Sequence, residues 1–210
     1  MARILLGVSG GIAAYKSLEF TRLAIKACHS LRVVQTPDSL NFVGRASFEG
    51  VTGAPVLVGQ FDADRSGGAF PGQPRPDHDP IGHLELAANC DIYVIAPATA
   101  NTIAKLAAGF ADNMLTALAI SCRRPILVAP AMNNEMYLNA ATAENVATLT
   151  RRGMHVLEPG TGELASRGEY GIGRLPEPAA LLAAAERLLA DVPAGAATVD
   201  RRGAQPPGFA

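Results

Sequence analysis

The chain has 210 residues, which suffices for one domain with a full-sized hydrophobic core. Its net charge of -1 excludes the basic surfaces that bind nucleic acids or anionic membranes, and no apolar stretch reaches the roughly 18 residues that span a bilayer. Three widely spaced cysteines exclude a zinc motif or a disulfide framework, so we expect no metal and a cytoplasmic location. Only 18% of residues are charged, which suggests that other subunits cover part of the surface.

Short apolar runs alternate with segments of helical periodicity along the chain. The expected strands cover residues 3–8, 31–34, 56–58, 92–96, 125–129 and 155–157. The expected helices cover residues 12–28, 39–47, 83–88, 101–120 with a break near Gly109, 142–152 and 178–189. This alternation predicts an α/β fold, a single parallel sheet with helices on both faces. Such sheets bind ligands at the carboxyl ends of their strands.

Two segments interrupt the alternation. Residues 62–80 hold four prolines and three glycines, and we interpret them as a mobile surface loop that is not a packed element. Residues 191–210 are rich in alanine, glycine and proline and are expected to be a disordered tail. The expected organisation is one domain over residues 1–190 followed by this tail.

Three loops with small or polar residues follow three of the expected strands. Residues 7–12 (GVSGGI) form a glycine turn between a strand and a helix, which suits either a phosphate or a plain turn. Residues 97–102 (PATANT) suit either a cofactor edge or an N-cap. Residues 130–133 (PAMN) hold the third equivalent position. Because all three lie at one edge of a parallel sheet, their convergence predicts a binding site there.

A histidine and a glycine-rich segment complete the candidate features. His83 follows Gly82 at the start of an expected helix, and its imidazole could act as a base near neutral pH or be merely structural. Residues 159–178 hold five glycines after the last expected strand. Such a segment is either a lid over the substrate or a solvated connection.

In this order, these motifs resemble the homo-oligomeric flavin-containing cysteine decarboxylases. The resemblance runs from about residue 4 to residue 189 and depends on residues 7–13, 81–83, 97–105, 130–133 and 171–174. The family includes phosphopantothenoylcysteine decarboxylase and the peptidyl-cysteine decarboxylases of modified-peptide pathways. The resemblance implies a Rossmann-like, flavodoxin-like domain that binds FMN.

The resemblance also implies a role for individual residues. His83 matches the active-site histidine, and Asn133 matches the asparagine that binds the substrate carboxylate, with Met132 beside it. The residues that match flavin-contacting positions are Ser9, Gly10, Gly11, Ile12, Thr36, Ser39, Phe42, Thr99, Ala100, Asn101 and Thr102. The family forms trimers, often assembled into dodecamers, with the active site between neighbouring subunits.

The chemistry that the resemblance implies begins with oxidation of a cysteine. A cysteine carboxylate does not leave spontaneously, because the resulting carbanion has no electron sink. Transfer of a hydride from the cysteine Cβ to FMN gives a thioaldehyde beta to the carboxylate, so that carbon dioxide can leave and an enethiolate remains. We expect His83 to assist loss of the thiol proton and Asn133 to orient the carboxylate.

The expected lid departs from the coenzyme A branch of the family. In that branch the lid carries a cysteine that takes part in reducing the enethiol. Here residues 164–169 read LASRGE, so Ser166 or Arg167 stands at that position. The resemblance implies that Ser166 and Arg167 contact the substrate. A serine hydroxyl is a much poorer proton donor than a thiol. This difference favours a precursor peptide ending in cysteine, with an enethiol product. The alternatives are phosphopantothenoylcysteine decarboxylase and an inactive flavoprotein regulatory subunit.

Overall fold

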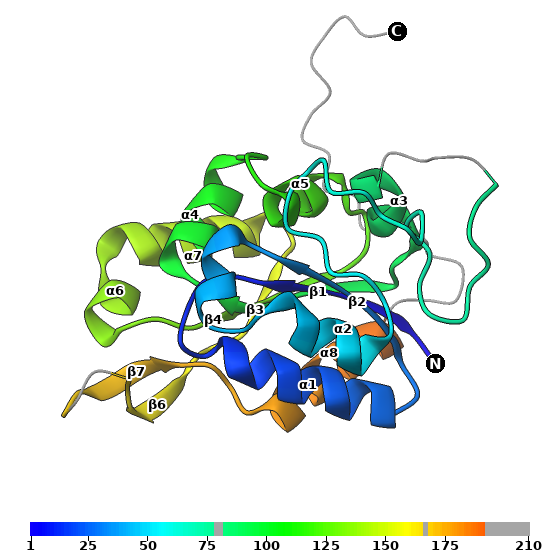
Figure 1. Cartoon of the computed structure of the whole chain (residues 1–210). Coiled ribbons are helices and arrows are strands. Elements are labelled where there is room, and N and C mark those ends of the chain that lie inside the picture. Colours follow the sequence, from blue (N-terminus) through cyan, green and yellow to red (C-terminus); the bar gives the residue numbers. More distant parts are fainter. Residues whose placement is uncertain (78–81, 166–167, 192–210) are drawn as a thin grey trace, which may run out of the picture.

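The computed structural model describes residues 1–77, 82–165 and 168–191, and their backbone forms one α/β domain (Figure 1). Five parallel strands make the central sheet in the order β2-β1-β3-β4-β5. Their bounds are β1 Arg3–Val8, β2 Ser30–Gln35, β3 Ile92–Ala98, β4 Ile126–Pro130 and β5 His155–Val156. The three central strands are almost wholly buried, as expected for a parallel sheet with both faces covered. The predicted fold class is confirmed.

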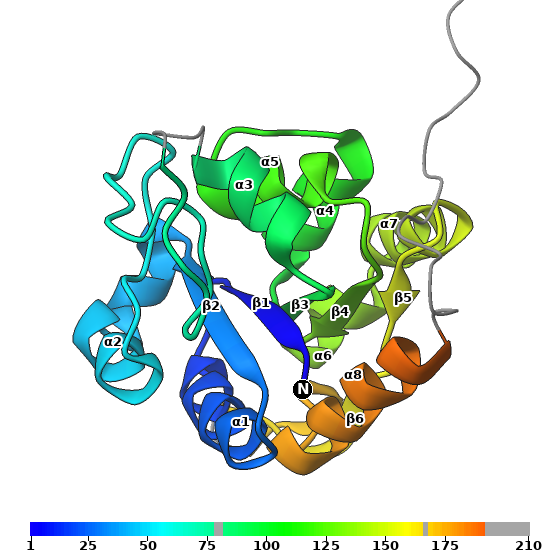
Figure 2. The same ribbon diagram turned by 90° about the vertical axis from the view of Figure 1, so that its right-hand side faces the viewer.

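Helices cover both faces of the sheet (Figure 2). One face packs against α1 Ala14–Lys26, α2 Arg45–Thr52 and α8 Pro178–Asp191. The other packs against α3 Gly82–Asn89, α4 Ala100–Ala108, α5 Met114–Ser121 and α7 Ala140–Arg151. Two buried clusters, one on each side of the sheet, therefore form the core. Among the described residues no helix is long and apolar enough to cross a membrane.

Local signals explain where several helices begin and end. Thr99 caps α4, whose C-terminal neighbour Gly109 adopts a left-handed conformation with φ of 77°. Asn113 and Thr116 form a capping box at the start of α5. These signals divide the expected helix 101–120 into two helices, and the predicted break near Gly109 is confirmed.

Two expected elements differ from the structure. The expected helix 39–47 is a 3-10 helix, Pro37–Asn41, followed by α2, because Gly44 is extended (φ −71°, ψ 154°) and interrupts the helical path. The expected strand 56–58 makes only an isolated bridge between Leu57 and Val34. It therefore lies beside β2 without extending the sheet.

The glycine-rich segment 159–178 contains strands that its sequence did not predict. β6 Gly160–Glu163 and β7 Tyr170–Arg174 form an antiparallel hairpin outside the main sheet, next to α6 Asn134–Leu138 (Figure 1). Glycine at alternate positions removes the apolar alternation by which a strand is recognised. The segment is thus a hairpin with mostly exposed strand residues, and its role as a lid remains a prediction.

The interpretation of residues 62–80 as an unpacked loop is wrong for part of the segment. Phe70 is 2% exposed and belongs to the core cluster. Asp64, almost fully buried, pairs with the buried Arg32 of β2 at 2.9 Å. The segment lacks a regular element, but an ion pair and an aromatic ring attach it to the sheet. Its mobility remains a prediction, and residues 78–80 lie outside the described residues, as does the expected tail from residue 192 on.

Candidate functional site

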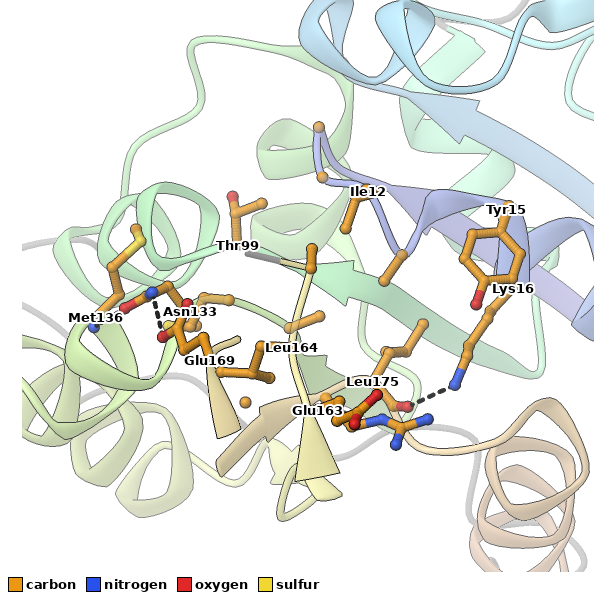
Figure 3. A pocket seen from close by; sticks show the side chains of 18 residues that line it. Ile12, Tyr15, Lys16, Thr99, Asn133, Met136, Glu163, Leu164, Glu169 and Leu175 are labelled. Atoms are coloured by element: carbon orange, nitrogen blue, oxygen red, sulfur yellow. Dashed lines mark hydrogen bonds between the residues drawn. The ribbon is translucent and has the colours of Figure 1, made fainter. Parts of the chain in front are cut away.

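Three strand-end loops meet at one cavity of about 480 Å³ at the carboxyl edge of the sheet. The loop after β1 contributes Gly10 and Gly11, the loop after β3 contributes Thr99, and the loop after β4 contributes Met132 and Asn133. Figure 3 shows these walls together with side chains of α1 and of the β6–β7 hairpin. The predicted convergence therefore produces a half-open cavity of a size that suits a small-molecule ligand.

Ser9 connects the loop after β1 to the loop after β3 by hydrogen bonds. Its side chain is 1% exposed, its hydroxyl donates to the Pro97 carbonyl at 2.7 Å, and it accepts from the Thr99 amide at 3.0 Å. Because both partners are main-chain groups, Ser9 holds the ends of β1 and β3 at a fixed spacing. Ser9 therefore supports the loops that form the cavity, but it does not line the cavity itself.

The glycine turn requires its two glycines for close packing. A Cβ at Gly10 would lie 2.6 Å from the Cβ of Asp38, and a Cβ at Gly11 would lie 3.5 Å from the Thr99 side chain. The next helix, α1, has no side-chain cap at its N-terminus. An uncapped helix start behind a narrow glycine turn suits an anionic group such as a phosphate.

The predicted flavin contacts Thr36, Ser39 and Phe42 belong to the segment after β2, whose Asp38 lies against this glycine turn. The Thr36 amide donates to the Val8 carbonyl at 3.0 Å, and its buried hydroxyl has no hydrogen-bond partner within the described parts of the chain. Ser39 is fully buried, donates to the Thr36 carbonyl at 2.7 Å and accepts from Gln35. Phe42 is 49% exposed. Thr36 thus offers an unused polar group, whereas the Ser39 hydroxyl already serves the local backbone.

The segment 99–102 has the geometry of a helix start. The Thr99 side chain accepts from the Thr102 amide at 3.3 Å, so the capping interpretation holds, and Thr99 also lines the cavity. Ala100 is half-buried, Asn101 is exposed and Thr102 is buried. Only Thr99 of these four reaches the cavity wall, and the flavin contacts of the other three remain predictions.

The orientation of the Asn133 amide follows from its neighbours. Asn133 caps α6, and its Oδ1 accepts from the amides of Glu135 and Met136 at 2.8 and 3.4 Å. Its Nδ2 donates to the Glu169 carboxylate from the hairpin (Figure 3). With the oxygen committed to the helix, the nitrogen is the atom that Asn133 presents to the site.

The hairpin is attached to the same loop through its backbone. The Met132 amide donates to the Gly173 carbonyl at 3.0 Å, and the Ile172 amide donates to the Asn134 side chain at 3.1 Å. Gly173 has φ of 143°, and a Cβ there would overlap the Met132 carbonyl oxygen. The hairpin therefore forms a fixed wall of the cavity at these positions.

Sequence reasoning missed several residues of the cavity wall. Lys16 of α1 is mostly buried, and its Nζ donates to the Leu175 carbonyl at 3.2 Å and to Glu177 at 2.7 Å. The hydrogen bond from Lys16 holds the pKa of Glu177 below its usual range. A lysine among the apolar positions of a helix next to a glycine turn was the available signal. The sequence carries no such signal for Glu163 and Glu169, because their glycine-rich segment predicts no regular element.

His83 starts α3 and is half-buried, but it is not among the described residues that line this cavity. Ser166 and Arg167, which are predicted substrate contacts, lie outside the described residues. Met132 lines the cavity, and its contact with the substrate remains a prediction. The described parts of the chain hold no group of three or more possible metal ligands.

Comparison with known proteins identifies relatives over nearly the whole domain. The coenzyme A biosynthesis bifunctional protein CoaBC of Mycobacterium tuberculosis is 44% identical over 187 residues, which cover 89% of this chain and 41% of the relative. The chain therefore spans less than half the length of that relative.

Two solved structures share the fold over most of their length. A cysteine-to-serine variant of a PPC decarboxylase, complexed with pantothenoylaminoethenethiol, has a TM-score of 0.74 and 32% identity, covering 89% of this chain and 97% of its own. The FMN-dependent cysteine decarboxylase SpaF has a TM-score of 0.68 and 29% identity, covering 88% and 98%.

The family profile described as Flavoprotein matches residues 1–189. This match includes every strand-end loop that lines the cavity and confirms the family resemblance expected from the five motifs. The chain thus belongs to the flavoprotein family.

Proposed function

We propose that this chain is an FMN-dependent decarboxylase that acts on phosphopantothenoylcysteine. The observation that carries the proposal is the 44% identity to CoaBC across the domain that contains the cavity. The two solved structures discriminate less, because a PPC decarboxylase and SpaF differ little in identity and TM-score. The relatives therefore favour the small coenzyme A precursor over the peptide substrate that the missing lid cysteine had favoured.

The cofactor is FMN, and the residues at the carboxyl edge suit it. Gly10 and Gly11 allow a phosphate to approach the uncapped start of α1, and Thr36 offers a buried hydroxyl without a partner among the described residues. Thr99 borders the cavity on the side of β3. When bound, FMN supplies the oxidising power that converts the cysteine side chain to a thioaldehyde.

Asn133 is proposed to bind the carboxylate that leaves as carbon dioxide. Its Nδ2 faces the cavity region while its Oδ1 is held by the start of α6. An amide N–H is a suitable donor to a carboxylate, and the walls around it exclude part of the water that would stabilise the charge. A less hydrated carboxylate loses carbon dioxide more readily.

His83 is proposed to take the thiol proton in an assembled oligomer. Its absence from the wall of the cavity of one chain supports a site that is shared between neighbouring subunits. Half-burial at the start of α3 leaves part of the ring accessible to a partner surface. The homotrimer expected from the family would bring such a surface to the cavity.

A second candidate substrate is the C-terminal cysteine of a precursor peptide. It is favoured by residues 159–178, which hold no cysteine that could return a proton to an enethiol. The solved PPC decarboxylase that carries a cysteine-to-serine change contains pantothenoylaminoethenethiol. The missing cysteine thus bears on the end point of the reaction as well as on the identity of the substrate.

Mass spectrometry of the products tests the proposal. The FMN-loaded protein is incubated separately with phosphopantothenoylcysteine and with a short peptide ending in cysteine. We expect turnover of the first compound only. Loss of carbon dioxide alone would indicate a completed reduction, and additional loss of two hydrogens would indicate an enethiol. Turnover of the peptide without turnover of phosphopantothenoylcysteine would overturn the proposed substrate.

A further inference from the structure

The donor atom of Asn133 that should receive the substrate carboxylate already holds another carboxylate. Glu169 of the hairpin accepts from Asn133 Nδ2 and, at 3.4 Å, from the Asn134 amide (Figure 3). Both Glu169 and Asn133 line the cavity and are half-buried. The protein thus contains a carboxylate of its own at the position proposed for the substrate carboxylate.

Three further contacts make this arrangement specific. The Glu169 carbonyl accepts from the Leu164 amide at 2.8 Å, which holds the backbone of residue 169 across the hairpin. The Ile172 amide donates to Asn134, which anchors the same strand to the loop after β4. Because Asn133 Oδ1 is committed to α6, rotation of the amide cannot relieve the competition. A substrate carboxylate must therefore replace Glu169 on Nδ2 or share that donor with it.

We infer that Glu169 is a specificity-determining residue that exchanges with the substrate carboxylate on Asn133, an inference that rests on the proposed function. A ligand with a carboxylate competes with the Glu169 carboxylate for the N–H groups of Asn133 Nδ2. A ligand that has lost its carboxyl group cannot accept a hydrogen bond from Asn133 in this way, so Glu169 keeps its hydrogen bond to Asn133. After carbon dioxide leaves, Glu169 regains its bond to Asn133, and the product draws no binding energy from that donor.

Binding of two ligands to FMN-loaded protein tests this exchange. The first is the serine counterpart of phosphopantothenoylcysteine, which keeps the carboxylate but has no thiol to oxidise. The second is the same compound without its carboxyl group. Their dissociation constants are measured by calorimetry for the native chain and for Glu169→Gln and Glu169→Ala.

We expect the carboxylated ligand to bind about tenfold more tightly to Glu169→Ala, because a competing charge-assisted hydrogen bond is worth about 1.5 kcal/mol. Glu169→Gln keeps a neutral acceptor, so its gain should be smaller. The ligand without the carboxyl group should bind all three proteins with constants that agree within about twofold.

Glu163→Gln is the matched control. It removes one negative charge from the same hairpin and the same cavity, and no hydrogen bond between Glu163 and Asn133 is present. An equal gain in Glu163→Gln would show a general charge effect. Unchanged binding of the carboxylated ligand to Glu169→Ala would show that Glu169 does not compete, and weaker binding would show that Glu169 assists. Each of these results overturns the exchange. If neither ligand binds the native chain, the proposed function fails instead.

Discussion

The hydroxyl of Ser9 illustrates how single residues shape this site. It donates to the Pro97 carbonyl and accepts from the Thr99 amide, so both of its interactions serve the backbone. The family resemblance predicted a flavin contact at this position, and that contact remains a prediction. The sequence shows a hydroxyl residue within the glycine turn that follows the first expected strand. The partner of its hydroxyl could not be predicted, because Pro97 lies on a strand about 88 residues further along the chain.

The environment of the buried cysteines explains why neither of them can replace the cysteine that residues 159–178 lack. Cys90 and Cys122 are buried, with their sulfur atoms 3.8 Å apart. The hydrogen bond with Cys122 and burial raise the pKa of the Cys90 thiol well above its usual range. Cys28 is exposed. Since the thiolate is the reactive form, neither buried cysteine is suited to proton or thiol chemistry in the site.

Alkylation measures this difference. Iodoacetamide at pH 8 should modify only Cys28 in the folded FMN-loaded protein, whereas all three cysteines should react after denaturation. Mass spectrometry of peptides identifies the modified residues, and Cys28→Ser should remain unmodified while folded. Rapid modification of folded Cys90 would contradict the assigned burial and pKa direction.

At the scale of elements, residues 64–70 act as a strap between β2 and α3. Arg32 donates to the Ala69 carbonyl at 2.6 Å as well as to Asp64. On the other side Asn89 of α3 donates to the Gly68 carbonyl at 3.3 Å. Gly68 has φ of 79°, and a Cβ there would lie 2.5 Å from the Glu85 side chain. The strap therefore supports α3, whose second residue is His83.

Substitution of Arg32 tests how much this strap contributes. Arg32→Met leaves Asp64 buried without its cation, so we expect the free energy of unfolding to fall by about 3 kcal/mol. Arg45→Met is the control, because Arg45 pairs with Asp62 on the surface and its loss should cost about 0.5 kcal/mol. Urea unfolding followed by circular dichroism compares the two. Similar losses in both variants would argue against a structural role for the buried pair.

In the whole molecule, the cavity of one chain contains Asn133 and Glu169, but His83 does not line it. One chain brings together the glycine turn, Thr99 and Asn133 around the cavity, and His83 starts a helix that is not part of that wall. The low fraction of charged residues, 18%, fits a surface that is covered by other subunits. We therefore expect the proposed activity to depend on assembly.

Mixed oligomers test this dependence. His83→Asn and Asn133→Ala should each be inactive alone. When the two are expressed together, random assembly should restore about a quarter of the native activity if each site takes His83 and Asn133 from different subunits. Decarboxylation rates of the separate and mixed proteins are compared at equal FMN content. A mixture no more active than its components would place both residues in sites within one chain.

The sequence by itself determined the layered fold and the place of the site. Alternating strand and helix patterns are local, because burial of each element leaves its own period in the sequence, and parallel connections bring the loops at residues 7–12, 97–102 and 130–133 to one edge. The glycines of the first loop were informative because only glycine permits the close approach of Asp38 to Gly10.

Only the tertiary structure decided what surrounds those loops. The hairpin has no apolar alternation, and Asn133 and Glu169 meet across 36 positions of sequence, so their contact depends on the path of the backbone between them. The buried pair of Arg32 and Asp64 was likewise invisible, because a charged residue in a predicted strand does not indicate its partner. Local patterns specify elements, whereas pairings between distant polar groups arise only when the packed elements bring them together.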